Sequence, residues 1–539
     1  MEPIALLLFA AAIAYGVAHL LHVPSIPVLL LTGVALTLTQ PLPPTLVQDT
    51  LVLGTTLLLF ATGIELNPRR SRAQRTAAGR VGTIQFLLLG AVGLLAAVAL
   101  GYEALPAMYI ALALTASSTL VVVRLLQRRR QMFEPFGRLV LGVLLLQDVL
   151  VLLLVPVVTD LPDGLLPVIT GVGATLALVG LAWATFRWVA PLIQRLDRED
   201  EVILLVLLAV LFVFIGLADL LDLPLVTGAF LAGIGLSRFP LNGMVRAHLG
   251  SIAEFFSALF FIALGALIGI PTGLELFHAI ILAAVVVVVT APLVTVIAER
   301  AGMSSRASIE AGLLLTQTSE ISLVIGLFGL IGEQITRSVF IVIALVTLFT
   351  MLLTPFIAND AVAWWLMRRR RVRAIPQRRS LDRMTPTAGH VLILGSGATG
   401  MPLLETVLGM GHDVLVIDDD PVVIQRLREA DIPCLRGDAS DIALLKRASA
   451  NKARIITSTI RRPQDNRRLL EFARGVPALI RVFEESDAKW ISELGGTPVL
   501  ASHAAGAEML KWFDQEFERG PGGAGAPAAG ASVEGSRSG

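Results

Sequence analysis

The sequence predicts a polytopic α-helical membrane protein followed by a smaller, Rossmann-like α/β domain. Three observations lead to this fold class. The 539 residues are 55% hydrophobic and only 16% charged, whereas an ordinary soluble chain is roughly 25% charged. Up to about residue 357 the apolar residues form runs of about 17–25, each long enough to cross a bilayer. After residue 389 the apolar runs are short, β-branched and separated by amphipathic helices.

The long apolar runs predict about thirteen membrane spans, with the first one retained rather than cleaved as a signal peptide. We place them, to within several residues, at 4–20, 26–39, 47–65, 82–100, 106–126, 139–159, 165–193, 202–219, 222–237, 253–270, 275–298, 307–331 and 337–357.

Arginine in the loops orients these spans. It is concentrated at 69–80, 124–138, 238–246 and 300–306, whereas the intervening loops carry acidic residues or no charge. Thirteen spans put every arginine-rich loop on one side, which the positive-inside rule makes cytoplasmic. The N-terminus is then outside, and everything after the last span is in the cytoplasm.

Composition also excludes several classes of protein. The formal net charge of +1 argues against a nucleic-acid partner bound by bulk charge. A single cysteine, Cys434, excludes an intrachain disulfide framework and a zinc site built from cysteines. We expect no metal site beyond that of a transported cation.

Carboxylates at membrane depth are costly, so they are candidates for function. Asp148 follows Gln147 in the middle of the span LLLQDVLVLLL, where a charge has no short route to water. We expect Asp148 to bind ions or protons. Glu320 is a second candidate, with pairing to a neighbouring span as its structural alternative.

Polar residues interrupt two spans, seven spans apart. In span five they are Thr115, Ser117, Ser118 and Thr119, and in span twelve they are Thr316, Gln317, Thr318, Ser319 and Glu320. Hydroxyl clusters can simply bond back to helix carbonyls. Their spacing instead favours inverted repeats of spans 1–6 and 8–13, with broken helices that cross near the midplane and form an ion site.

The membrane part resembles the monovalent cation:proton antiporter-2 family, in particular its Kef-type potassium efflux systems. The matching segments include LFATGIELNP, ALTASSTLVVVRLL, LLLQDVLVLLLVP and LLTQTSEISLV. The resemblance implies that the protein lies in the cell (inner) membrane. It also implies that Asp148 is the ion-binding carboxylate, with Gln147 beside it, and that the broken helices cross at 115–119 and 316–320. Electrogenic sodium relatives carry an Asp-Asp pair and a partner lysine. Here the pair is Gln-Asp and the first lysine is Lys446, which favours potassium and electroneutral exchange.

The segment HVLILGSGATGMPLLETVLGMGHDVLVIDDD predicts a strand, a glycine-rich turn, a helix and a second strand. Gly395, Gly397 and Gly400 form the G-x-G-x-x-G pattern, and Asp418 lies 23 residues after Gly395. In this setting the pattern predicts a dinucleotide-type phosphate site with Asp418 near the ribose. Too little chain follows for a dehydrogenase, so we expect a regulatory nucleotide and no enzyme activity.

This region is similar to RCK domains, also called KTN or TrkA-N. The resemblance implies a homodimer that binds an adenine nucleotide (NAD(H), AMP or similar) and responds to a small anionic effector or an ancillary regulatory subunit. Arg481 matches an effector contact, with carbonyl capping at a strand end as the alternative. The residues that match the nucleotide site are Gly395, Ser396, Gly397, Ala398, Thr399, Gly400, Asp418 and Asp438.

The domain prediction is a transporter domain at 1–357, a basic linker at 358–388, an RCK domain at 389–516 and a disordered tail at 517–539. The predicted function is potassium:proton antiport regulated by nucleotide. A nucleotide-gated cation channel and a sodium:proton antiporter remain alternatives, although no potassium-channel filter of TVGYG type occurs. A membrane-anchored sensor would not need a carboxylate in mid-span.

Overall fold

The computed structural model contains two compact units, Met1–Ile375 and Pro376–Gly539. The structure describes residues 2–21, 23–39, 43–65, 75–129, 131–132, 135–189, 200–237, 243–369, 388–397, 399–460 and 465–519.

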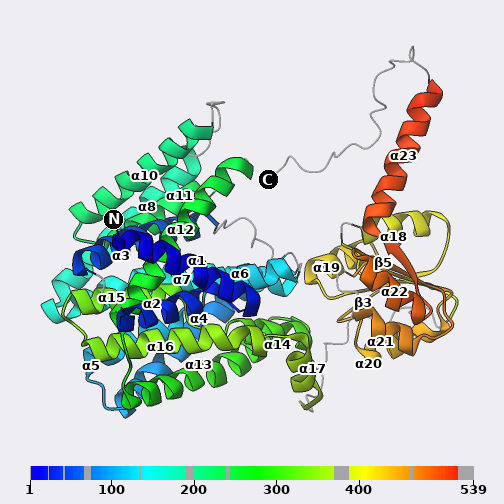
Figure 1. The fold of residues 1–539 in the computed structure, drawn as a ribbon. Coiled ribbons are helices and arrows are strands. Elements are labelled where there is room, and N and C mark those ends of the chain that lie inside the picture. The colour runs from blue at the N-terminus through cyan, green and yellow to red at the C-terminus, as the bar shows by residue number, and fades with distance from the viewer. Residues whose placement is uncertain are drawn as a thin grey trace. The chain divides into compact units, whose positions relative to one another are not determined.

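The first unit is entirely helical in its described part (Figure 1). Its helices are α1 (Glu2–Leu21), α2 (Ser25–Thr39), α3 (Pro44–Glu65), α4 (Arg75–Ala99), α5 (Ala104–Thr115), α6 (Thr119–Arg128), α7 (Pro135–Asp160), α8 (Leu165–Ala184), α10 (Asp200–Leu220), α11 (Leu225–Leu236), α12 (Gly243–Ile268), α13 (Gly273–Arg300), α14 (Ser305–Leu314), α15 (Glu320–Ile331), α16 (Arg337–Ile357) and α17 (Asp360–Arg369). A 3-10 turn, η2 (Leu161–Asp163), follows α7, and a short π-helical segment, η3 (Thr185–Val189), follows α8.

Within the described residues, 8 helices are long and apolar enough to cross a membrane, and 5 shorter apolar helices accompany them. Both predicted interruptions are present. The run expected at 106–126 is two helices, α5 and α6, and the run expected at 307–331 is α14 and α15. Because α5, α11 and α15 are shorter than a full span, the exact number of crossings remains a prediction.

Small residues allow some helices of this unit to pack at backbone contact. A Cβ on Gly33 of α2 would lie 2.1 Å from the Ile262 carbonyl oxygen of α12, and a Cβ on Gly265 would lie 2.1 Å from that of Leu30. The α2–α12 contact therefore requires glycine on both sides, as is common where membrane helices associate without a hydrophobic driving force. Residues of the same two helices also line a cavity.

The second unit holds a parallel sheet of 6 strands in the order β3-β2-β1-β4-β5-β6. The strands are β1 (Val391–Leu394), β2 (Val414–Asp418), β3 (Cys434–Arg436), β4 (Ile455–Ser458), β5 (Ala478–Val482) and β6 (Thr497–Leu500). The order reverses between β1 and β4, and ligands of such sheets bind at the carboxyl ends of the strands beside this reversal. The sheet confirms the predicted Rossmann-like class.

Helices connect these strands and cover the sheet. They are α18 (Gly400–Gly409), α19 (Pro421–Glu429), α20 (Ile442–Arg447), α21 (Asp465–Phe472), α22 (Glu485–Glu493) and α23 (Ala501–Arg519), with a short turn η4 (Ala450–Lys452). Two apolar clusters fill the space against the sheet, one around Leu415 and Ile480 and the other around Ile393 and Leu427. Most of the expected linker and residues 520–539 of the expected tail lie outside the described residues.

Candidate functional site

The first interruption is built by its own side chains. Helix α5 ends at Thr115, and the following Ala116 is extended, with φ −91° and ψ 141°. The Ser118 side chain then accepts a hydrogen bond from the Val121 amide at 3.3 Å and begins α6. A serine that caps a helix start in this way competes with continuation of the preceding helix.

In the second interruption, too, a serine side chain caps the helix that follows. The Ser319 side chain accepts from the Ile321 amide at 3.2 Å and begins α15. The Thr318 amide donates to the Thr350 hydroxyl at 3.1 Å, and the Thr318 hydroxyl lies 3.0 Å from that of Thr347. Both partners belong to α16, which therefore fixes the non-helical backbone of the break.

The two interruptions contact each other. The Ser117 hydroxyl donates to the Leu315 carbonyl at 3.0 Å, and the Gln317 amide nitrogen lies 3.5 Å from the Ser118 carbonyl oxygen. Irregular backbone at membrane depth is tolerated where it is buried in protein or lines a cavity. These contacts join residues about two hundred positions apart into one polar centre.

Asp148 lies at this centre, with none of its surface exposed. Its Oδ2 accepts a hydrogen bond from the Thr119 hydroxyl at 3.1 Å. The neighbouring Gln147 Oε1 accepts one from the Ser117 amide at 3.2 Å. The α7 segment Gln-Asp therefore holds the first interruption at two points.

Three atoms of Asp148, Gln147 and Gln317 have no hydrogen-bond partner among the described residues. They are Asp148 Oδ1, Gln147 Nε2 and Gln317 Oε1. Buried polar atoms without a partner are uncommon and costly. Two of the three are oxygens, the donor type that a monovalent cation prefers, and one carries a carboxylate charge.

Glu320 adds a second carboxyl group to this centre. It is the first residue of α15 and is 1% exposed. Its charge repels that of Asp148, so the two carboxylates favour an added positive charge between or beside them. The positive N-terminal ends of α6 and α15 partly offset the two negative charges.

The remaining predicted hydroxyls have other partners. The Thr115 hydroxyl donates to the Leu112 carbonyl of its own helix at 2.7 Å, and the side chains of Ser118 and Ser319 serve as caps. Of the four hydroxyls predicted in span five, Thr119 is the one bonded to Asp148. Sequence reasoning missed Thr347 and Thr350, although a threonine stripe at helical spacing along α16 is a signal that could have indicated them.

The glycine-rich turn of the second unit follows β1. Gly395 has φ +80°, and a Cβ on Gly400 would lie 2.1 Å from the Gly395 carbonyl oxygen. Nothing lies within 4 Å of the position that a Cβ on Gly397 would occupy. The first and third glycines thus shape the turn, and the second leaves open space at the start of α18, where a phosphate binds in folds of this class.

Asp418 ends β2 and is 8% exposed. Its Oδ2 accepts from the Ser396 amide at 2.7 Å and its Oδ1 from the Asp420 amide at 2.8 Å. Burial raises the pKa of Asp418, and these amide hydrogen bonds oppose the rise. Asp418 therefore already fixes the glycine turn, and contact with a ribose would use its remaining lone pairs.

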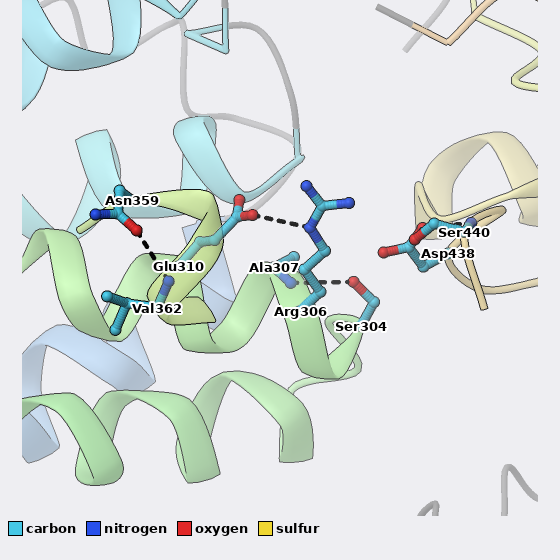
Figure 2. Close-up of polar contacts among 8 residues, drawn as sticks. All are labelled: Ser304, Arg306, Ala307, Glu310, Asn359, Val362, Asp438 and Ser440. Atoms are coloured by element: carbon cyan, nitrogen blue, oxygen red, sulfur yellow. Dashed lines mark hydrogen bonds and ion pairs between the residues drawn. The ribbon is translucent and has the colours of Figure 1, made fainter. Parts of the chain in front are cut away.

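The predicted effector residue Arg481 and the predicted nucleotide residues Thr399 and Asp438 have partners within the second unit. The Arg481 guanidinium donates to the Thr399 hydroxyl at the start of α18 and lies 4.5 Å from the Phe483 ring centroid. Asp438 Oδ1 accepts from the amide and hydroxyl of Ser440, at 2.8 and 2.6 Å (Figure 2). Ala398 lies outside the described residues.

Comparison with known proteins identifies both units. The family model described as sodium/hydrogen exchanger, transmembrane, matches residues 5–363. The chain belongs to the sodium/hydrogen exchanger family. Residues 391–500 match the TrkA-N domain, so this exchanger carries a TrkA-N domain after its membrane part. It is a cation:proton antiporter, a secondary transporter rather than an enzyme.

Two curated relatives and one solved structure are similar to this exchanger. The glutathione-regulated potassium-efflux system protein KefC of Shigella flexneri is 27% identical over 437 residues, which cover 78% of this chain and 68% of that protein. KefC of Escherichia coli (strain K12) has the same identity and coverage. The sodium proton antiporter MjNhaP1 from Methanocaldococcus jannaschii has a similar fold, with a TM-score of 0.52, 16% identity, and coverage of 68% of this chain and 99% of that chain.

Proposed function

We propose that this exchanger moves potassium ions against protons across the cell (inner) membrane, and that Asp148 binds the two alternately. The observation that carries the proposal is the buried Asp148 carboxylate with Oδ1 unpartnered at the crossing of two broken helices. A buried carboxylate is costly unless it is neutralised. A proton and a cation each neutralise it, and because they compete for one group the two fluxes are coupled.

Two observations favour potassium over sodium. The KefC relatives are named as potassium-efflux proteins. In addition, the residue before Asp148 is Gln147 rather than a second aspartate, and no lysine precedes Lys446. The transported cation would replace part of its hydration shell with Asp148 Oδ1, Gln317 Oε1 and carbonyls of the two interruptions.

A single exchanging carboxyl group leads to electroneutral transport. In each transport cycle the Asp148 site carries one proton across the membrane in one direction. It carries one monovalent cation in the other direction. The charge of the loaded site is then the same in both directions, and no net charge moves.

We also propose that an adenine nucleotide at the glycine turn regulates transport from the cytoplasm. The open space at Gly397, the N-terminus of α18 and the nearby Arg481 suit a bound phosphate. In the proposed assembly two copies of the chain pair, and their TrkA-N domains bind the nucleotide and a small anionic effector. Regulation requires that the nucleotide bind two arrangements of this pair with different affinity.

Helix α17 is the element that would transmit this change to the ion site. It forms the first part of the expected linker and packs against α14, the first half of a broken span. Asn359 begins α17 by accepting from the Val362 amide at 2.9 Å, and α14 carries the buried Arg306–Glu310 ion pair at 3.0 Å (Figure 2). A displacement of α17 therefore acts on a helix that ends at the polar centre.

The test compares Asp148→Asn with Asp163→Asn in proteoliposomes loaded with a pH-sensitive dye. Asp163 is exposed in the turn η2 that follows α7, so it provides a matched loss of a carboxylate. Potassium, sodium and rubidium gradients should each be applied. We expect potassium and rubidium to drive proton movement through the wild type and Asp163→Asn, and no coupled movement through Asp148→Asn. Normal exchange by Asp148→Asn would refute the assignment.

A further inference from the structure

A cavity of about 200 Å³ lies between α6 and the helices α1, α2, α3 and α12. Tyr15, Ser25, Thr62, Arg124 and Glu254 are among the residues that line it. Arg124 begins the arginine-rich segment that the positive-inside rule assigns to the cytoplasm. The cavity therefore lies on the predicted cytoplasmic side of the polar centre.

An ion pair spans this cavity. Arg124 Nη2 of α6 lies 2.6 Å from Glu254 Oε1 of α12, and the two residues are 130 positions apart in the chain. The ion pairs Arg306–Glu310 and Arg467–Glu471 instead each bridge one turn of a single helix. The two side chains are 39% and 61% exposed, so the pair is reachable by solvent ions and contributes little to folding stability.

Helix α6 connects this ion pair to the polar centre. Its first residue, Thr119, donates to Asp148, and Arg124 lies five residues further along the same helix, about 7.5 Å along the axis. Among the described helices, α6 packs chiefly on α7. A change in the tie between Arg124 and Glu254 therefore alters the restraint on the helix that holds Asp148.

We propose that Arg124 and Glu254 form a cation-responsive gate over this cavity. An incoming monovalent cation binds the Glu254 carboxylate, releases the Arg124 guanidinium and opens the way to the exchange site. When the cation moves on, the ion pair forms again and closes the cavity. The proposal rests on the proposed exchange at Asp148 and adds a second, outer cation contact to it.

The gate predicts opposite effects for its two halves. Arg124→Gln leaves the Glu254 carboxylate free to attract cations, so the KM for potassium should fall about two- to fivefold. Glu254→Gln leaves an unpaired guanidinium that repels cations, so the KM should rise by a similar factor. A purely structural tie predicts loss of function in the same direction for both variants.

Proteoliposome exchange measures these KM values at fixed pH, first at low ionic strength and then with added choline chloride. Screening by the added salt should shrink both shifts. The double variant Arg124→Glu with Glu254→Arg should bring the KM back toward that of the wild type. Glu471→Gln removes the carboxylate of the exposed Arg467–Glu471 pair and serves as the control, with no expected shift.

A labelling experiment measures whether the gate is open without measuring transport. Cys434 is the single cysteine, so Cys434→Ser gives a background in which Ala61→Cys places a thiol in the cavity. Inside-out vesicles are treated with a membrane-impermeant maleimide, with and without KCl. We expect KCl to speed labelling in the otherwise wild-type protein and to have no further effect in Arg124→Gln, which is already open.

The two readouts separate the gate from the exchange site. With Asp148→Asn added, exchange should stop while KCl still speeds labelling. Equal labelling with and without KCl, or KM shifts in the same direction for Arg124→Gln and Glu254→Gln, would overturn the gate and leave the Asp148 assignment standing.

Discussion

Gln147 and Asp148 are adjacent on α7 yet hold different parts of the first interruption. Gln147 accepts the Ser117 amide of the non-helical segment, and Asp148 accepts the Thr119 hydroxyl at the start of the next helix. Two consecutive residues thus fix the backbone on both sides of Ser118. The amide side chain is neutral, so it satisfies this backbone group without adding a second titratable charge to the site.

Replacement of Gln147 tests this role. Gln147→Leu leaves the Ser117 N–H without an acceptor in a site with no exposed surface, which costs about 1–3 kcal/mol. We expect a lower unfolding temperature in detergent and weaker exchange. The protein that is still folded should also show a higher KM for potassium. Gln147→Glu keeps an acceptor oxygen and should restore the unfolding temperature in part. An unchanged unfolding temperature for Gln147→Leu would contradict the contact.

His390 gives the second unit a pH dependence. The residue has no exposed surface and immediately precedes β1. Burial lowers the pKa of His390 below its ordinary value, against smaller raising effects of the Ala448 backbone and the Asp413 charge. The unfolded chain therefore binds a proton at His390 more readily than the folded chain does. The contribution of neutral His390 to the free energy of unfolding is fully present above about pH 6.5 and is lost as the pH falls.

The isolated residues 388–519 should therefore unfold more easily below about pH 6.5, by up to about 1.4 kcal/mol for each pH unit until the folded-state pKa is reached. Urea unfolding followed by circular dichroism at several pH values measures this slope. His390→Gln cannot titrate, so its stability should change less between pH 7 and pH 5. Equal slopes for both proteins would show that other groups determine the acid sensitivity.

At the scale of single elements, the turn between β1 and α18 depends on its glycines in two different ways. Gly400→Ala places a Cβ 2.1 Å from the Gly395 carbonyl oxygen, so the backbone must shift and we expect a loss of stability of about 1–3 kcal/mol. Gly397→Val points into open space, so the folded domain should be retained. Its side chain would occupy the expected place of a phosphate, and calorimetric titration with NAD(H) or AMP should detect no binding. Tight binding by Gly397→Val would place the nucleotide elsewhere.

The two interruptions were predictable because polar runs inside long apolar spans are a local signal. The side chain that contacts Asp148 was not, because the direction of each hydroxyl depends on whether its residue is helical or extended. Thr115 still belongs to α5 and bonds back to it, whereas Thr119 begins α6 and points to Asp148. The glycine turn was likewise readable from sequence, but the two amide hydrogen bonds to Asp418 depend on the folded turn.

Contacts between segments that are distant in the chain could not be predicted from the sequence. From the sequence alone, Arg124 is one of several arginines in a predicted cytoplasmic loop and Glu254 has no assigned role. Their pairing becomes visible when folding brings α6 beside α12. The packing of α17 on α14 is similarly invisible in composition, where residues after 357 read as a basic linker. Periodicity and charge patterns describe single elements, and they do not specify which elements pair.

At the scale of the whole molecule, the number of titrating carboxyls decides how transport responds to voltage. One group, Asp148, exchanges one proton for one cation and moves no net charge. If Glu320 carried a second proton in each cycle, one net charge would cross the membrane. At 100 mV that charge is worth about 2.3 kcal/mol, which would change the gradient that transport can balance by about fiftyfold.

We expect no steady current on a solid-supported membrane after a potassium jump, under conditions in which a pH dye in matched proteoliposomes reports exchange. Glu320→Gln should leave this result unchanged, because in the electroneutral cycle the Glu320 carboxyl group keeps the same protonation state throughout. A steady wild-type current that disappears in Glu320→Gln would instead show that both buried carboxyls transfer protons. The stoichiometry would then be two protons for one cation, and the repulsion between Asp148 and Glu320 would be part of the transport cycle.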